Sequence, residues 1–177
     1  MKKKYLLSFV IVLWVLSIVA FVFTLYNRIE GLCLNEEGCH YLFDCTPEEF
    51  FDKEFEFYKY VGDLRGNSYV DGDGRLNLMF SPKQKKAFRE SEWLTGFEEL
   101  DDKSNIVLSA DLQSITFYSY SETYDEDVEL LYHVLYKLSA IQLLDGTPQQ
   151  DICIYLTEID AVTGETTFSG DVRFDRD

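Results

Sequence analysis

Histidine is scarce in this sequence, and the familiar enzyme motifs are missing from it. His40 and His133 are the only histidines, so a Ser-His-Asp or Cys-His arrangement would have to use one of the two. Neither a Gly-x-Ser-x-Gly nucleophile elbow nor a glycine-rich phosphate loop is present. Paired carboxylates, as in glycoside hydrolases, occur at any spacing by chance among 32 Asp and Glu residues. These absences favour a non-enzymatic protein.

Positive charge is also in short supply. The chain has 16 Lys and Arg against 32 Asp and Glu, a formal net charge of −16. Such a field repels nucleic acid, which we exclude as a partner, and it suits cations or a basic protein. The simpler interpretation is that the charge only keeps the domain soluble.

One long hydrophobic run is present near the N-terminus. From Tyr5 to Tyr26 the chain has no charged residue, and at ~1.5 Å per residue such a helix spans roughly 33 Å, enough for a hydrocarbon core of ~30 Å. Lys2, Lys3 and Lys4 precede the run, and positive flanks stay in the cytoplasm. The run predicts a single-pass anchor in the cell membrane with the C-terminal domain outside, and a cleaved signal peptide is the rival interpretation.

The chain has no internal repeat and no Gly/Ser/Pro-rich linker. We therefore expect three parts: a cytoplasmic tip and transmembrane anchor at 1–26, a juxtamembrane stalk at 27–45, and one acidic extracytoplasmic domain at 46–177.

Local patterns in the domain predict an α+β fold. Thr46-Pro47-Glu48-Glu49 and Ser81-Pro82-Lys83-Gln84 have the form of capping boxes that open helices. A third, strongly apolar helix is expected at 124–144, buried on two sides. Hairpins are expected at 67–80, 106–120 and 152–174. The prediction is one small antiparallel sheet of about three hairpins, with two or three helices packed on one face.

Four cysteines lie on the expected outer side, where thiols oxidise. The disulfide candidates are Cys33, Cys39, Cys45 and Cys153, and the sequence does not choose among the three complete pairings. A zinc site that uses His40 with the first three cysteines is disfavoured, because their spacing matches none of the usual zinc patterns.

Two further sites are weak candidates. Asp71 and Asp73, in Asp71-Gly72-Asp73-Gly74, resemble part of a calcium loop, so calcium is the one cofactor considered, but a tight hairpin turn explains the same residues better. Leu130 and Val134 on the long helix, and Lys83 and Lys86 in a basic cluster, are the candidate interaction residues. The cluster either meets an anionic polymer or neutralises carboxylates of the domain itself.

Together these patterns lead to a functional hypothesis. We expect a membrane-anchored, extracytoplasmic, non-enzymatic module of the cell envelope that binds or regulates another protein, with a basic protein as one candidate partner. The alternative is an outward-facing hydrolase that uses acidic residues, with or without calcium.

Overall fold

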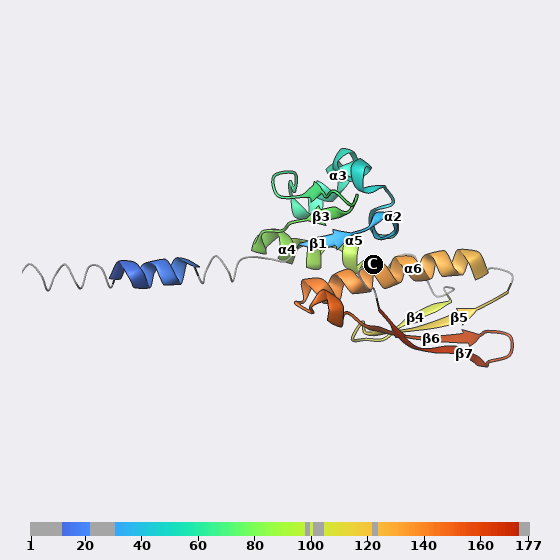
Figure 1. Ribbon diagram of the computed structural model, residues 1–177. Coiled ribbons are helices and arrows are strands. Elements are labelled where there is room, and N and C mark those ends of the chain that lie inside the picture. The colour runs from blue at the N-terminus through green and yellow to red at the C-terminus, as the bar shows by residue number, and fades with distance from the viewer. Residues whose placement is uncertain (1–11, 22–30, 98–99, 101–104, 122–123, 174–177) are drawn as a thin grey trace, which may run out of the picture.

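The computed structural model describes residues 12–21, 31–97, 100, 105–121 and 124–173 (Figure 1). From residue 31 onward the described chain forms an α+β fold with two sheets and five α-helices. Its elements are β1 (Leu32–Leu34), α2 (Glu36–Phe43), α3 (Pro47–Val61), β2 (Tyr69–Val70), β3 (Leu76–Leu78), α4 (Pro82–Arg89), α5 (Glu92–Thr95), β4 (Ile106–Leu108), β5 (Ser114–Ser119), α6 (Tyr124–Leu144), a 3-10 turn (Gln149–Asp151), β6 (Ile154–Asp160) and β7 (Thr166–Val172).

The strands form two sheets. The first has the order β1-β3-β2 and is antiparallel throughout. The second has the order β4-β5-β6-β7, and its central pair, β5 and β6, is parallel. Because parallel neighbours need a crossover, the chain passes through α6 between them. The expectation of one antiparallel sheet is therefore wrong, although the three hairpins themselves, β2-β3, β4-β5 and β6-β7, are confirmed.

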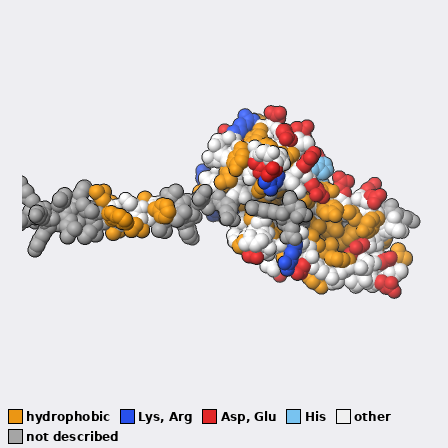
Figure 2. All heavy atoms as spheres, in the orientation of Figure 1, with side chains coloured by type: hydrophobic (Ala, Val, Ile, Leu, Met, Phe, Trp, Pro, Cys, Tyr) orange, Lys and Arg blue, Asp and Glu red, His pale blue; other side chains and the backbone are white. Residues whose placement is uncertain are grey.

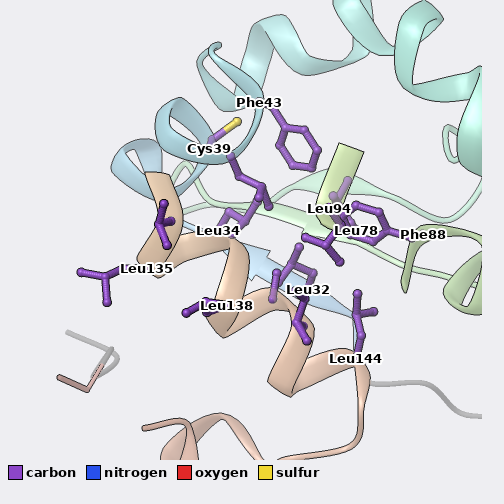
Figure 3. Close-up of a cluster of buried hydrophobic side chains, with 14 of the residues drawn as sticks. Leu32, Leu34, Cys39, Phe43, Leu78, Phe88, Leu94, Leu135, Leu138 and Leu144 are labelled. Atoms are coloured by element: carbon purple, nitrogen blue, oxygen red, sulfur yellow. The ribbon is translucent and has the colours of Figure 1, made fainter. Parts of the chain in front are cut away.

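Helix α6 forms the middle layer of the fold. In Figure 1 it lies between the second sheet and the part of the molecule that holds α2 to α5 and the first sheet. Its side chains Leu135, Leu138 and Leu144 are buried, and in Figure 3 Leu144 lies near Leu32 of the first sheet, whereas Leu135 points away from that sheet. The predicted bounds of this helix and its burial on two sides are confirmed.

The predicted membrane anchor is not supported. Within the described residues no helix is both long and apolar enough to cross a membrane. Of the predicted run, the structure describes residues 12–21, and these are helical. The rest of that run, residues 5–11 and 22–26, lies outside the described residues. The single-pass topology, the membrane as a partner and the localisation deduced from them are corrected accordingly.

The segment interpreted as a stalk contributes to the folded core. Of residues 27–45, the first four lie outside the described part, and the remainder forms β1, α2 and the following corner. Leu32 and Leu34 pair with Leu78 and Leu76 of β3, and all four are buried. The stalk interpretation missed this strand because three residues are too few to show a periodic pattern.

The two capping boxes are confirmed, at Thr46 for α3 and at Ser81 for α4. The helix expected to run from Ser81 to about Trp93 is instead divided in two. Ser91 causes the break, because its hydroxyl accepts a hydrogen bond from the backbone N–H of Leu94 and caps a new short helix, α5. The break turns Trp93 towards α2 and α3.

Candidate functional site

A sharp corner between α2 and α3 builds one wall of the candidate site. Asn35 caps the start of α2, and the helix ends where Asp44 adopts a left-handed conformation with φ 51°. Asp tolerates positive φ better than most residues do. Thr46 then begins the cap of α3. This geometry leaves the Asp44 side chain 88% exposed at the rim.

Aromatic rings form the floor beside this corner. The Phe43 and Phe57 ring centroids lie 5.2 Å apart, and Trp93 lies 5.8 Å from Phe57. The indole N–H of Trp93 donates to the Leu42 carbonyl at 3.3 Å and thereby ties α5 to the end of α2. Tyr60 of α3, which is 41% exposed, lies 6.3 Å from Trp93. Aromatic side chains from three helices therefore converge at one place.

A groove with two lobes runs over this floor. The first lobe, between α2, α5 and α6, has a volume of about 340 Å³, and the second, along α3, has about 540 Å³. Both volumes fall in the range of roughly 300–1,000 Å³ that ligand sites occupy. The lobes share Phe43, Asp44 and Trp93. We call the two lobes together the acidic groove.

The charge of the acidic groove is mainly negative. Its carboxylates are Asp44, Glu92, Asp52, Glu54 and Glu56. Its lysines are Lys53 and Lys137, and each has an ammonium group that donates to a backbone carbonyl, of Asp44 at 2.8 Å and of Gly96 at 2.9 Å respectively. The groove thus offers exposed carboxylates at its rim while its cations are engaged with the backbone.

Helix α6 closes the first lobe with two polar side chains. Glu129, His133 and Lys137 follow one another at a spacing of four, which predicts a solvent-exposed stripe. In the structure His133 is half-buried, with its Nδ1 in a hydrogen bond with the Tyr41 carbonyl, and Lys137 is only 7% exposed. The Lys137 ammonium also lies 5.5 Å from the centre of the Phe97 ring. His133 and Lys137 therefore form a seam against α2 and α5, whereas Glu129 is exposed.

A tyrosine stack lies next to this seam. Tyr41 of α2 is stacked on Tyr132 and Tyr136, one turn apart on α6, with centroids 5.3 and 5.6 Å away. Partial burial raises the pKa of Tyr136 to about 12, and the negative charge of Glu37 contributes to this rise. The pKa of Tyr41 is raised by the same two causes. These phenols consequently stay protonated and neutral.

The calcium candidates lie in a turn that is already satisfied. Asp71 accepts hydrogen bonds from backbone N–H groups of Asp73 and Arg75, and the Arg75 guanidinium reaches both carboxylates, at 3.2 and 2.7 Å. The hydrogen bonds that Asp71 accepts lower its pKa. The Arg75 guanidinium therefore supplies the positive charge between the carboxylates of Asp71 and Asp73. Among the residues that the structure describes, no cluster of three or more His, Cys, Asp or Glu could hold a metal ion, and His40 lies instead beside Asp44.

The other candidate residues fall outside the groove. Val134 is 1% exposed and Leu130 is partly buried against the core, so this face of α6 packs inside the fold. Lys83 is exposed, and Lys86 lies 3.8 Å from Glu90. Arg89, from the same cluster, makes a two-pronged ion pair with Asp145. These pairs agree with a cluster that neutralises carboxylates of the domain.

The cysteines are divided between the two halves of the fold. Cys39 and Cys45 lie together at the α2–α3 corner, with their Sγ atoms 3.8 Å apart. Cys33 is on β1 of the first sheet, and Cys153 precedes β6 of the second. All four are in the described part of the chain, and no disulfide joins any two of them.

Comparisons with known proteins do not assign the chain to a family. No family model, no curated protein and no solved structure matches it.

Sequence reasoning did not identify the residues of the acidic groove. Asp44, Tyr60, Glu92 and Trp93 come from three separate segments, and no spacing connects them. The only signal was compositional, namely the surplus of acidic and aromatic residues, and composition does not show which of them meet.

Proposed function

We propose that this protein is a binding module that receives a basic segment of a partner protein in the acidic groove. The observation that carries the proposal is that Tyr60 and Trp93 line the same lobe as Asp44 and Glu92. Aromatic faces with carboxylates beside them favour an arginine or lysine side chain.

The physical fit has two parts. A cation over an aromatic face gains ~0.5–1 kcal/mol at an exposed site and more where it is desolvated. The carboxylates at the rim and the net charge of −16 attract a basic chain over a longer range and speed its encounter with the groove. An acidic segment would meet repulsion from both sources.

The hydrolase alternative has less support from the same side chains. A general acid in a cleft needs a carboxyl group whose pKa is raised by burial or by a neighbouring anion. Within the described ranges, four carboxyl groups have a pKa that clearly departs from its ordinary value. All four pKa values are lowered, by hydrogen bonds in helix caps and turns. The groups are Glu49, Asp71, Asp111 and Asp160, and none of them lines the groove.

The test substitutes an aromatic residue of the groove, because charge alone attracts basic peptides to any acidic surface. The probe is a fluorescein-labelled peptide rich in arginine and lysine, titrated with the full chain and followed by fluorescence anisotropy. Tyr60→Leu removes the Tyr60 ring from the first lobe, and we expect a loss of affinity of about twofold, which corresponds to the lower cation–π value of ~0.5 kcal/mol.

The matched control is Tyr58→Leu. Tyr58 lies on the same helix, is 52% exposed and lines neither lobe. We expect this control to bind the probe like the parent. Equal losses in both variants, or a probe of reversed charge that binds as well, would refute binding in the groove.

A further inference from the structure

We propose that Cys39 and Cys45 form a disulfide under oxidising conditions, which makes the α2–α3 corner a site of covalent modification. The inference does not rest on the proposed binding function. It rests on the placement of the two sulfur atoms and on the fold of the chain between them.

The two thiols are already neighbours. Their Sγ atoms lie 3.8 Å apart in a thiol–thiol hydrogen bond, and the side chains are 0% and 5% exposed. A disulfide needs the sulfurs at about 2.0 Å, so small rotations of the two side chains bring them into bonding range. Figure 3 shows Cys39 on α2, close to Phe43.

The chain between the cysteines holds this arrangement. Residues 40–43 complete α2, and the left-handed Asp44 then reverses the chain so that Cys45 returns to Cys39. The backbone N–H of Asp44 donates to the His40 carbonyl at 2.8 Å, which fixes the reversal. Thr46 caps α3 directly afterwards. Both ends of the short loop are thus anchored by helices.

The chemistry is a thiol–disulfide exchange with a small disulfide such as oxidised glutathione. The Cys45 thiolate attacks one sulfur of the oxidant, the oxidant's S–S bond breaks, and one glutathione thiolate leaves. The Cys39 thiolate then attacks the Cys45 sulfur and expels the second glutathione. Two protein thiols are oxidised, one disulfide of the oxidant is reduced to two thiols, and the two protons pass to solvent or to the leaving thiolates.

The order of attack follows from access. Cys45 lines the second lobe of the acidic groove, whereas Cys39 has no exposed surface. Burial raises the pKa of both thiols, so little thiolate is present at neutral pH and the reaction is slow in the folded protein. A slow first step followed by rapid ring closure is the expected course, because the second sulfur is already adjacent.

The disulfide would close a ring around one wall of the acidic groove. Tyr41, Leu42, Phe43 and Asp44 all lie within the ring and line the first lobe. Oxidation therefore restrains the backbone that carries these side chains.

The test uses the full chain with Cys33→Ser and Cys153→Ser, so that only the proposed pair remains. The folded protein is incubated with oxidised glutathione, quenched in acid, and treated with N-ethylmaleimide under denaturing conditions. We expect both thiols to resist alkylation until a reductant is added, with the intact mass lower by two hydrogen atoms. Chymotrypsin cleaves after Tyr41, Leu42 or Phe43, so an internal disulfide leaves two peptides joined through Cys39 and Cys45.

Two further variants and the unmodified chain make the result decisive. With Cys39→Ser in the same background, Cys45 should stop at the mixed disulfide with glutathione, whereas with Cys45→Ser the buried Cys39 should form its mixed disulfide more slowly, as the proposed order of attack requires. Peptide mapping of the unmodified chain repeats the assignment without any substitution. The inference is overturned if Cys39 and Cys45 remain alkylatable after prolonged oxidation, or if either pairs with Cys33 or Cys153 in the unmodified chain.

Discussion

Neutralising the rim of the acidic groove should weaken the binding of a basic peptide by an amount that depends on salt. The perturbation is the double variant Asp44→Asn/Glu92→Gln, which removes two charges and keeps the size of both side chains. Both residues line the first lobe. The Asp44 side chain is 88% exposed, so removal of its charge should cost the fold little.

The magnitude follows from Coulomb's law. A peptide cation seated over Trp93, ~6 Å from each carboxylate, gains about 0.7 kcal/mol per carboxylate in a water-like dielectric. The water-like value is appropriate because the Asp44 side chain is largely solvated. Screening reduces the gain to ~0.5 kcal/mol at ~0.02 M salt and to ~0.3 kcal/mol at ~0.15 M. The double variant should therefore bind about fivefold more weakly at low salt and about threefold more weakly at physiological salt.

The assay is fluorescence anisotropy with the labelled basic peptide at both salt concentrations. The control is Asp151→Asn/Glu165→Gln, which removes the same net charge from two exposed residues that line neither lobe. This control should lose less than twofold at low salt, through the overall field alone. Equal losses in the two double variants would show that the peptide is attracted by net charge and not by the groove.

Three further predictions concern stability. Glu54 is 3% exposed and accepts hydrogen bonds from the backbone N–H of Leu64 and from Arg65. Glu54→Ala should therefore lower the free energy of unfolding, measured by urea denaturation, by about 2 kcal/mol, because a buried N–H loses its partner. The control Glu56→Ala, an exposed change on the same helix, should cost a few tenths of that loss. Four carboxyl groups have a lowered pKa in the folded protein: Glu49, Asp71, Asp111 and Asp160. Their contribution to stability is present at neutral pH, begins to be lost near pH ~4 where the carboxyl groups of the unfolded chain protonate, and continues to fall as the pH passes through the native pKa values. Urea midpoints that stay constant from pH 7 to pH 3 would contradict this prediction. A Cys39–Cys45 disulfide closes a small loop and should stabilise the protein by about 2 kcal/mol on the loop-entropy estimate. The melting temperature should then be several degrees higher without reductant than with it. A lower melting temperature in the oxidised form would mean that the bond strains the corner.

Local signals along the chain were reliable where the interaction spans only a few residues. The capping boxes at Thr46 and Ser81 and the turn at Asp71 each depend on hydrogen bonds within four residues, so the sequence contains the whole interaction. The apolar run of α6 likewise predicted a long helix buried on two sides. Figure 2 shows hydrophobic side chains that remain on the surface over α6 and the adjoining sheet.

Errors arose where a pattern has more than one tertiary solution. Alternating strands predicted hairpins, but adjacency of all three hairpins was assumed. The parallel pairing of β5 with β6 joins two of the hairpins in one sheet, whereas the β2-β3 hairpin pairs with β1 in a separate sheet. Helical spacing placed His133 and Lys137 on one face of α6, yet it contains no information on what packs against that face. The apolar run at 5–26 suggested a span by composition, which the described helix at 12–21 does not support.

The sequence by itself determined the acidic charge, the α+β class and most helix and hairpin positions, because these follow from composition and from contacts between near neighbours. The tertiary structure alone decided that α6 separates two sheets and that Cys39 lies against Cys45. It also assembled the acidic groove from α2, α3, α5 and α6. The physical reason is that burial of apolar surface is not directional, so only the packing of the whole chain determines which distant side chains meet.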